Sequence, residues 1–167
     1  MTALVRLAED IGAAWRLGPA TRLLHALPLH HMHGIAIALL PSLLAGGTTR
    51  FLPRFETGRV WHELGGTNTF MGVPTMYHRL LAAHDDAPPH EQPRLATTAR
   101  GLTLATSGAS ALPAVMAERW RALAGAPPLE RYGMTEIGVA CSNPFEPAAR
   151  RLARVGPALP TVELRLV

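Results

Sequence analysis

The sequence predicts an α/β protein in which helices cover a mostly parallel sheet. Short apolar runs typical of buried strands alternate along the chain with segments whose apolar residues recur at helical spacing. Glycine or proline stands at most of the boundaries between them. This alternation favours a parallel sheet with right-handed crossovers. With 167 residues, 48% of them hydrophobic and 17% charged, the chain is long and apolar enough for one compact core.

The residue pattern in the first third of the chain predicts two helices and two strands. Apolar residues at helical spacing indicate an amphipathic helix over residues 4–15, which Thr2 is placed to cap. Residues 23–27 are typical of a buried strand. Residues 34–45 are apolar on all sides, which predicts a helix buried all round, and residues 48–52 predict the next strand.

The remainder of the chain alternates in the same way. Three further helices are expected to start at a residue suited to a helix N-terminus, namely Thr57, Pro74 and Pro113. Further strands are expected at residues 69–73, 102–105, 126–129 and 161–167. Residues 84–93 and 141–154 predict exposed loops.

Charge and composition exclude several classes of protein. The net charge is +4, and the 16 basic residues are all arginine and scattered, so no nucleic-acid patch is predicted and an anionic small substrate fits better. The longest uncharged stretch, residues 23–49, is broken by Pro28 and Pro41 and makes a poor membrane span. The single Cys141 favours a reducing compartment, and the chain does not open with a secretory signal pattern, so we expect a cytoplasmic protein.

Polar groups suited to a nucleotide concentrate at residues 130–136, Glu-Arg-Tyr-Gly-Met-Thr-Glu. They follow the apolar residues 126–129, so we expect them just beyond the carboxyl end of a strand, where open α/β sheets bind ligands. Tyr132 offers a flat face to a purine, Thr135 a hydroxyl to a phosphate, and Glu136 an oxygen ligand to Mg²⁺. The alternative is a strand-to-loop turn with solvated charges.

Three histidines, His30, His31 and His33, follow the strand expected at residues 23–27. They suggest a metal site, but a tight loop rarely directs several imidazoles at one centre, and no cysteine or carboxylate stands nearby in sequence. The ordinary alternative is a set of packed or partly exposed loop histidines.

Two serines, Ser107 and Ser110, lie in a turn of small residues between a strand and a helix, which suggests a nucleophilic serine. The Gly-x-Ser-x-Gly elbow of the hydrolases is not matched, because Leu112 stands where its second glycine would be. A serine hydrolase is therefore disfavoured.

Two stretches together resemble the adenylate-forming enzymes, which comprise acyl-CoA synthetases, luciferases and the adenylation domains of peptide synthetases. Tyr-Gly-Met-Thr-Glu at residues 132–136 is similar to their adenine- and magnesium-binding signature. Pro-Leu-His-His-Met-His-Gly at residues 28–34 is similar to their Pro-Leu-x-His substrate motif. Residues 72–77 and 107–113 also resemble family segments, and the form of the two motifs is most similar to the malonyl-CoA synthetases.

The resemblance implies an acid–thiol ligase that uses ATP, Mg²⁺ and coenzyme A to form malonyl-CoA or a related acyl-CoA through an acyl-adenylate. It implies catalytic roles for Thr135 and Glu136, with Glu136 as the Mg²⁺ ligand. The residues implied in substrate binding are His31, Ser107, Gly108 and Arg131. The residues implied in nucleotide binding are Gly108, Ala109, Ser110, Glu130, Tyr132, Gly133, Met134 and Thr135.

Arg131 and Gly108 also carry physical arguments. A malonyl group keeps one free carboxylate, and the planar guanidinium of Arg131 can hold it through two parallel hydrogen bonds. The alternative for Arg131 is an ion pair with Glu130 or another surface acid. At Gly108, a ligand that lies on the backbone leaves no room for a bulky Cβ substituent.

Lysine is absent from the sequence. Because the resemblance implies one lysine in a phosphate loop and another in a C-terminal lid domain, we expect residues 1–167 to be a single partial AMP-binding domain that is inactive alone. The alternatives are a general short- or medium-chain acyl-CoA synthetase and a noncatalytic nucleotide-binding remnant. Ala153 stands where the family usually has a glycine, which strains the turn if positive φ is required there.

Overall fold

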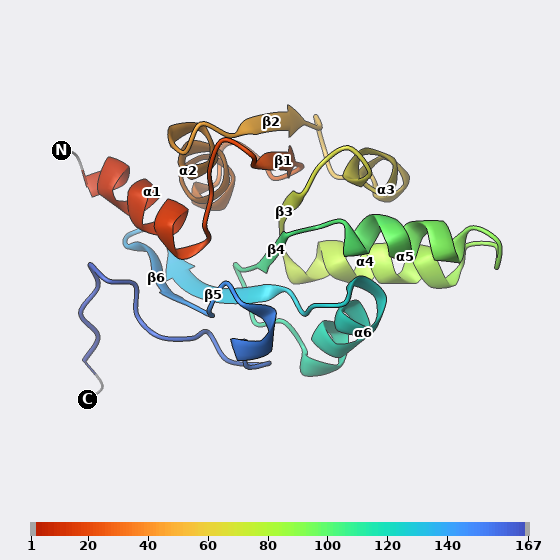
Figure 1. The fold of residues 1–167 in the computed structure, drawn as a ribbon. Helices are drawn as coiled ribbons and strands as arrows, with labels where there is room; N and C mark the ends of the chain where they lie inside the picture. Colours follow the sequence, from red (N-terminus) through yellow and green to blue (C-terminus); the bar gives the residue numbers. More distant parts are fainter. Residues whose placement is uncertain (1–2, 166–167) are drawn as a thin grey trace.

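The structure is a computed structural model that describes residues 3–165 (Figure 1). Its centre is a six-stranded sheet in the order β2, β1, β3, β4, β5, β6. The first five strands are parallel, and β6 is antiparallel to β5, so the predicted helix-covered, mostly parallel sheet is confirmed. The strands are β1 Arg22–His25, β2 Thr48–Phe51, β3 Thr69–Gly72, β4 Leu104–Ser107, β5 Leu129–Met134 and β6 Gly138–Ser142.

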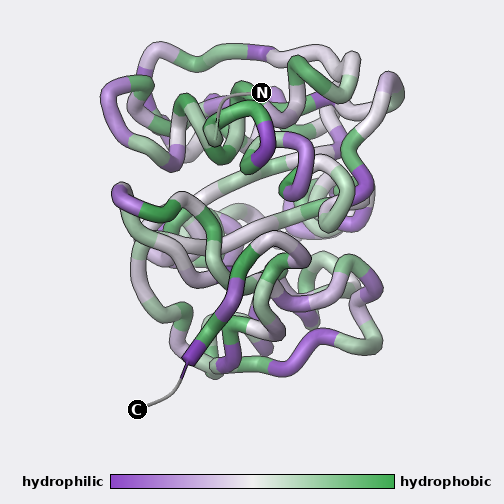
Figure 2. Tube along the Cα trace, turned by 90° about the vertical axis from the view of Figure 1, so that its left-hand side faces the viewer, coloured by the Kyte–Doolittle hydropathy of each residue, from purple (hydrophilic) through white to green (hydrophobic). Residues whose placement is uncertain are grey.

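Two groups of helices pack against this sheet. Helix α1, the π-helix η1 and helix α2 contact one another, and helices α3 to α6 form the second group (Figure 1). Hydrophobic and hydrophilic residues alternate over short distances along most of the chain, as elements buried on one side require (Figure 2). The helices are α1 Ala3–Ala14, η1 His33–Leu39, α2 Leu40–Leu44, α3 Thr57–Leu64, α4 Pro74–Asp85, α5 Gln92–Arg100, α6 Ala114–Ala124 and the short 3-10 helix η2 Pro147–Ala149. Within residues 3–165, no helix has the length and apolar character to cross a membrane.

Three aromatic side chains join the second helix group to the sheet. Trp61 and Trp120 stack with their ring centres 6.2 Å apart, and Tyr77 meets Trp120 edge-on at 4.8 Å. All three are buried. The Tyr77 hydroxyl donates a 2.7 Å hydrogen bond to the carbonyl oxygen of Thr106, close to the end of β4. This bond fixes the strand end that leads into the candidate site.

The stretch 34–45, predicted as one helix buried all round, is divided into η1 and α2. In η1 the Leu40 N–H donates to the carbonyl oxygen of Ile35, five residues earlier. Pro41 gives a physical reason, because it has no N–H to donate and its ring crowds the preceding turn, which a wider helix relieves. The expected all-round burial is wrong, because helix α1 and the sheet cover only part of the surface of η1 and α2. The half-exposed side chains are Ile35, Leu43 and Leu44.

The polar residues 130–136 lie in a β-hairpin and not in a loop beyond a strand, which corrects the expectation. β5 includes Glu130 to Met134, and only residues 135–137 form the turn before β6. A Cβ on Gly133 would lie 1.9 Å from the carbonyl oxygen of Gly138, so the absence of a side chain permits the close pairing. Residues 130–134 therefore lie on β5, with a shift in pairing register between Tyr132 and Gly133, and Thr135 and Glu136 lie in the turn.

Several smaller expectations were also wrong. The loop predicted at 141–154 begins inside β6, and that predicted at 84–93 ends inside α5, which the sequence analysis missed. Residues 161–165 form no strand, because alternation supplies the faces of a strand but not the neighbour that it must pair with. Glu56, not Thr57, is the N-cap of α3. Thr2 and residues 166–167 lie outside the described residues.

Replacing Gly125 with alanine should lower the free energy of unfolding by about 1 kcal/mol. Gly125 ends α6 with φ of +84°, where an L-residue is strained. Among the described residues, no atom lies within 4 Å of the added Cβ, so backbone strain acts alone. Gly12→Ala is the control, because its site in α1 is also open, and it should raise stability by about 0.5–1 kcal/mol. Urea denaturation measures both, and effects of the same sign would contradict this account.

Candidate functional site

Two adjoining cavities open just beyond the carboxyl ends of the parallel strands. The large cavity, of about 670 Å³, is lined by residues of the segment 27–37 and of the β5–β6 hairpin. The small cavity, of about 320 Å³, is lined by residues of the segment 107–111 and of β5, together with Ala153 and Val155. Arg131, Gly133 and Ala109 line both cavities. The two cavities therefore share a wall, and Arg131 is its charged member.

The large cavity combines apolar walls with a few polar groups. Its polar side chains are His31, His33, Arg131, Thr135 and Glu136. Its apolar lining residues are Leu27, Pro28, Met32, Ile37, Val73, Met76, Ala109 and Met134. Such a concave, mainly apolar space with convergent polar groups is typical of a small-molecule site.

Arg131 is a buried cation that has no ion pair among residues 3–165. Its side chain is 6% exposed, and its Nε has no hydrogen-bond partner among residues 3–165. The ion pairs of these residues do not include Arg131, so the alternative pairing with Glu130 is absent from the described structure. Burial lowers the pKa of Arg131 to about 10, which leaves it protonated at neutral pH. A buried, uncompensated charge is costly, so this position is suited to an anionic ligand.

Gly108 makes room for that guanidinium. β4 and β5 pair with Ser107 beside Glu130, and this register brings Gly108 next to Arg131. A Cβ on Gly108 would lie 2.2 Å from Nε and 2.4 Å from Cζ of Arg131. A small residue was expected here because a ligand would lie on the backbone. In the structure, the Arg131 side chain occupies the space that a Cβ would need.

His33 is the buried one of the two histidines that line the large cavity. It is 8% exposed, and neither ring nitrogen has a hydrogen-bond partner among residues 3–165. Burial first, then the charges of Arg131 and His25, lower its pKa from 6.5 to about 3, so the ring is neutral at physiological pH. His31, the predicted substrate histidine, also lines the cavity, but it is exposed, with its ring 4.3 Å from that of His30.

The turn before η1 fixes the position of His33. The His25 Nε2 lies 2.9 Å from the carbonyl oxygen of Gly34, and a Cβ on Gly34 would lie 2.2 Å from the carbonyl oxygen of Pro28. The sequence analysis did not assign His33 to the site. The available signal was its place directly before an apolar helix, where a side chain is directed toward the core.

The small cavity gathers most of the residues predicted to bind a nucleotide. Tyr132 is 47% exposed at this cavity, while Ser107 is buried and its Oγ has no partner among the described residues. Within residues 3–165, no imidazole is hydrogen-bonded to the Ser107 hydroxyl. Ala109 and Ala153 have φ values of +71° and +54°. The positive φ suspected at Ala153 is confirmed, and such strain is commonly retained near ligand sites.

Glu130 holds the surrounding loops instead of facing a ligand freely. Its Oε1 accepts a 2.9 Å hydrogen bond from the backbone N–H of Ala153. Burial raises the pKa of Glu130, and hydrogen bonds from the backbone of Ala153 and Leu112 oppose that rise. Because Ala153 lines the small cavity and Leu112 follows the segment 107–111, this carboxylate ties two sides of the cavity together.

Thr135 and Glu136 lie in the exposed hairpin turn at the rim of the large cavity. Both are free of hydrogen bonds to other side chains among the described residues, and no group of three metal-ligating side chains gathers there. Mg²⁺ ordinarily takes one or two protein carboxylates and completes its shell with phosphate oxygens and water. One exposed carboxylate beside a hydroxyl fits that pattern.

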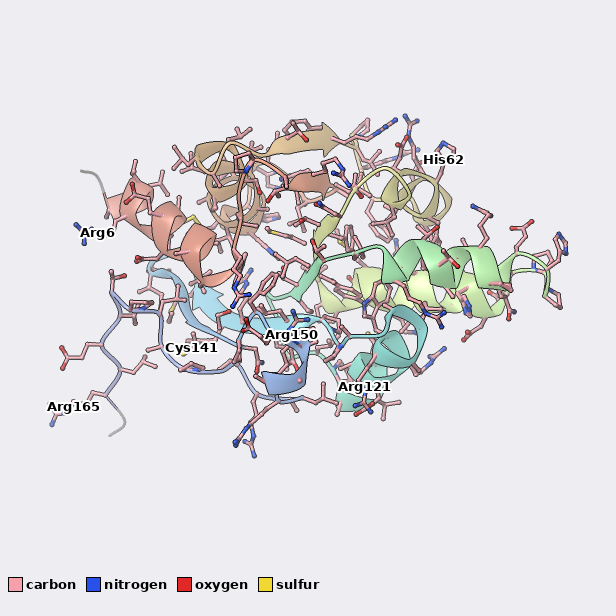
Figure 3. All side chains as sticks on the ribbon, in the orientation of Figure 1. Arg6, His62, Arg121, Cys141, Arg150 and Arg165 are labelled. Carbon is pink, nitrogen blue, oxygen red and sulfur yellow. The ribbon has the colours of Figure 1, made fainter. Side chains whose placement is uncertain are left out.

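Arg150 ties together the segments on either side of the β5–β6 hairpin. Figure 3 shows Arg150 between β5 and the C-terminal segment. The Arg150 guanidinium donates hydrogen bonds to the carbonyl oxygens of Pro127, Pro144 and Phe145. These bonds join the lead-in to β5 with the segment after β6. None of these three bonds involves the turn at residues 135–137, which stays accessible to a ligand.

Comparison with known proteins gives one family for the whole chain. The AMP-binding enzyme family matches residues 1–167. The chain is 42% identical over 153 residues to the mitochondrial malonate–CoA ligase of Homo sapiens, which covers 87% of this chain and 27% of that protein. The chain therefore spans only about a quarter of the length of this relative.

Solved structures agree with this match. A malonyl-CoA ligase in a ternary product complex with methylmalonyl-CoA and AMP has a TM-score of 0.88 and 39% identity, covering 99% of this chain and 35% of that one. ATP-bound MatB from Rhodopseudomonas palustris has a TM-score of 0.83 and 36% identity, covering 95% of this chain and 30% of that one. The adenylate-forming fold implied by the sequence is confirmed, and the chain belongs to the AMP-binding enzyme family.

Proposed function

We propose that this chain carries the acid-binding part of an ATP-dependent acid–thiol ligase that forms malonyl-CoA. The observation that carries the proposal is the buried guanidinium of Arg131 on the wall between the two cavities, whose Nε has no partner among residues 3–165. Malonate is activated at one carboxylate and keeps the other, and that second carboxylate would be held by Arg131. Ser107, whose buried Oγ also lacks a described partner, would add a hydrogen bond to the bound acid.

The nucleotide would lie on the small-cavity side. Tyr132 presents a half-exposed ring for an adenine, and Ala109 and Ser110 line the same cavity. The backbone of Gly108, next to Ala109, would also border the nucleotide. Thr135 would contact a phosphate oxygen and Glu136 would ligate Mg²⁺ at the rim. Bound Mg²⁺ would neutralise phosphate charge during adenylate formation. In this proposal Gly133 and Met134 border the nucleotide, and Glu130 supports the cavity through the backbone.

The reaction that we propose for the whole protein is the conversion of malonate, ATP and coenzyme A to malonyl-CoA, AMP and pyrophosphate. The residues of this chain would bind and orient the acid so that its reacting carboxylate faces the α-phosphate. His31 stays at the cavity rim in this proposal, where it would contact the incoming acid. Support comes from the names of the relatives, because the human protein is a malonate–CoA ligase and the solved relative a malonyl-CoA ligase.

We also propose that the chain forms a partial domain and lies in the cytoplasm. Residues 1–167 would form one partial AMP-binding domain that is inactive alone, which accords with the quarter of the human relative's length that the chain spans. A cytoplasmic location rests on the single Cys141. The human relative is named as mitochondrial, and a reducing interior is common to both places.

A second candidate is a general short- or medium-chain acyl-CoA synthetase, which the apolar lining of the large cavity favours. A segment exchange tests both. Residues 3–165 would replace the matching segment of the solved malonyl-CoA ligase, and AMP formation would be measured with malonate and with butyrate. We expect the malonate-dependent rate to exceed the butyrate rate at least tenfold. A higher butyrate rate would support the second candidate, and nucleotide binding without AMP formation would indicate a noncatalytic remnant.

Arg131→Leu should weaken malonate binding on the order of 100-fold, because each hydrogen bond to a charged group contributes about 1.5–3 kcal/mol. Butyrate has no second carboxylate, so its affinity should change less than about threefold. Isothermal titration calorimetry on the 167-residue protein measures both dissociation constants. Arg121→Leu is the matched control, since Arg121 lies on the outside of α6 (Figure 3). Equal losses for the two acids would remove Arg131 as the carboxylate clamp.

Gly108→Ala should weaken malonate binding about as much as loss of Arg131, because the new Cβ displaces the guanidinium. If both changes act through one contact, the double variant with Arg131→Leu should be no weaker than Arg131→Leu alone. Gly58→Ala is the control, since among the described residues its added Cβ meets no atom within 4 Å. Additive losses in calorimetry would show that Gly108 contacts the ligand independently.

A further inference from the structure

We propose that His33 is a specificity-determining residue that donates a hydrogen bond to the same carboxylate that Arg131 holds. This inference rests on the proposed function and deepens it, because it assigns a second protein contact to the distal carboxylate of the acid. The two side chains line one cavity from different elements, His33 at the start of η1 and Arg131 on β5. The carboxylate would lie between them.

The geometry that points to a ligand is the lack of partners on both sides of this space. The His33 ring is 8% exposed, and its two nitrogens are without hydrogen bonds among residues 3–165. The Arg131 Nε is equally without a partner there, at 6% exposure. Buried polar groups in folded proteins are nearly always hydrogen-bonded, because leaving one unpaired costs free energy. Two such groups facing one cavity indicate that the partner is a bound molecule.

The combined charge of His33 and Arg131 indicates which kind of group the bound molecule places between them. His33 stays neutral beside Arg131, so together they carry one positive charge and match one carboxylate. A neutral imidazole offers one N–H donor, while the guanidinium offers several donors in a fixed plane. An anionic group with two acceptor oxygens can use both residues at once. A neutral alkyl end in the same place leaves both unpaired, and sites of this kind reject such analogues strongly.

The surrounding backbone holds the His33 ring against this space. Gly34 packs on the carbonyl oxygen of Pro28 and accepts a hydrogen bond from His25, which fixes the backbone next to His33. His31 is not equivalent, because its exposed ring has solvent as an alternative partner. The buried position therefore belongs to His33.

The test compares malonate and butyrate binding by calorimetry in the 167-residue protein. His33→Leu, which keeps bulk but removes the donor, should weaken malonate binding about tenfold and leave butyrate binding unchanged or stronger. His33→Asn keeps an N–H donor and should recover part of the malonate affinity. His62→Ala is the control, because His62 lies on the exposed side of α3 (Figure 3), and it should change neither affinity.

The outcomes separate this inference from the proposed function. Unchanged malonate affinity in His33→Leu, or equal losses for malonate and butyrate, would overturn the role of His33 while the Arg131 clamp stands. A wild-type protein that fails to bind malonate would overturn the proposed function and this inference with it.

A second measurement needs no variant to fold. In nuclear magnetic resonance spectra, the His33 ring nitrogens should show no protonation between pH 8 and pH 5, because the pKa is lowered to about 3. Addition of malonate, but not of butyrate, should shift one ring N–H signal. A ring that titrates near pH 6.5, or that does not respond to malonate, would place His33 outside the binding space and overturn the inference.

Discussion

The guanidinium of Arg131 lies against the bare Cα of Gly108, and much of the site is arranged around that contact. The register of β4 and β5 sets the two residues side by side, and the missing Cβ supplies the space. Burying the Arg131 charge without an ion pair costs free energy in the unliganded protein. A bound anion would compensate for that cost. Backbone strain and uncompensated charge both lower the stability of a fold. Where a protein retains them, they commonly mark a ligand-binding site.

Two rigid walls keep this arrangement in place. On one side Tyr77 bonds to Thr106 and fixes the end of β4, and Glu130 ties the loops on either side of the small cavity. On the other side the turn before the π-helix η1 holds His33 toward the large cavity. π-helical turns often occur at functional sites, and here Pro41 gives a local cause. The polar groups are thus positioned before a ligand binds, which reduces the entropy lost on binding.

The sequence predicted the parts of the fold that depend on local pattern. The parallel strands and the helices that begin at Pro74 and near Pro113 follow from apolar spacing and from proline at the first turn. The β5–β6 hairpin was missed although its two strands are neighbours in the sequence. A strand was wrongly expected at 161–167, because alternation does not supply the neighbour that a strand must pair with. For the site, the residue types at 130–136 were informative. His31, the predicted substrate histidine, lines the large cavity with an exposed ring, and His33, which was not assigned to the site, is the buried histidine there.

The central claim is that Arg131 is a preformed carboxylate clamp, and its Nε–H signal in nuclear magnetic resonance tests that claim most directly. The structure predicts that the Arg131 Nε–H of the 167-residue protein, which has no partner among residues 3–165, shifts on addition of malonate and stays in place on addition of butyrate. The signals of exposed arginines such as Arg6 and Arg121 should not move with either acid (Figure 3). An Arg131 signal that ignores malonate, or that responds equally to butyrate, would contradict the account.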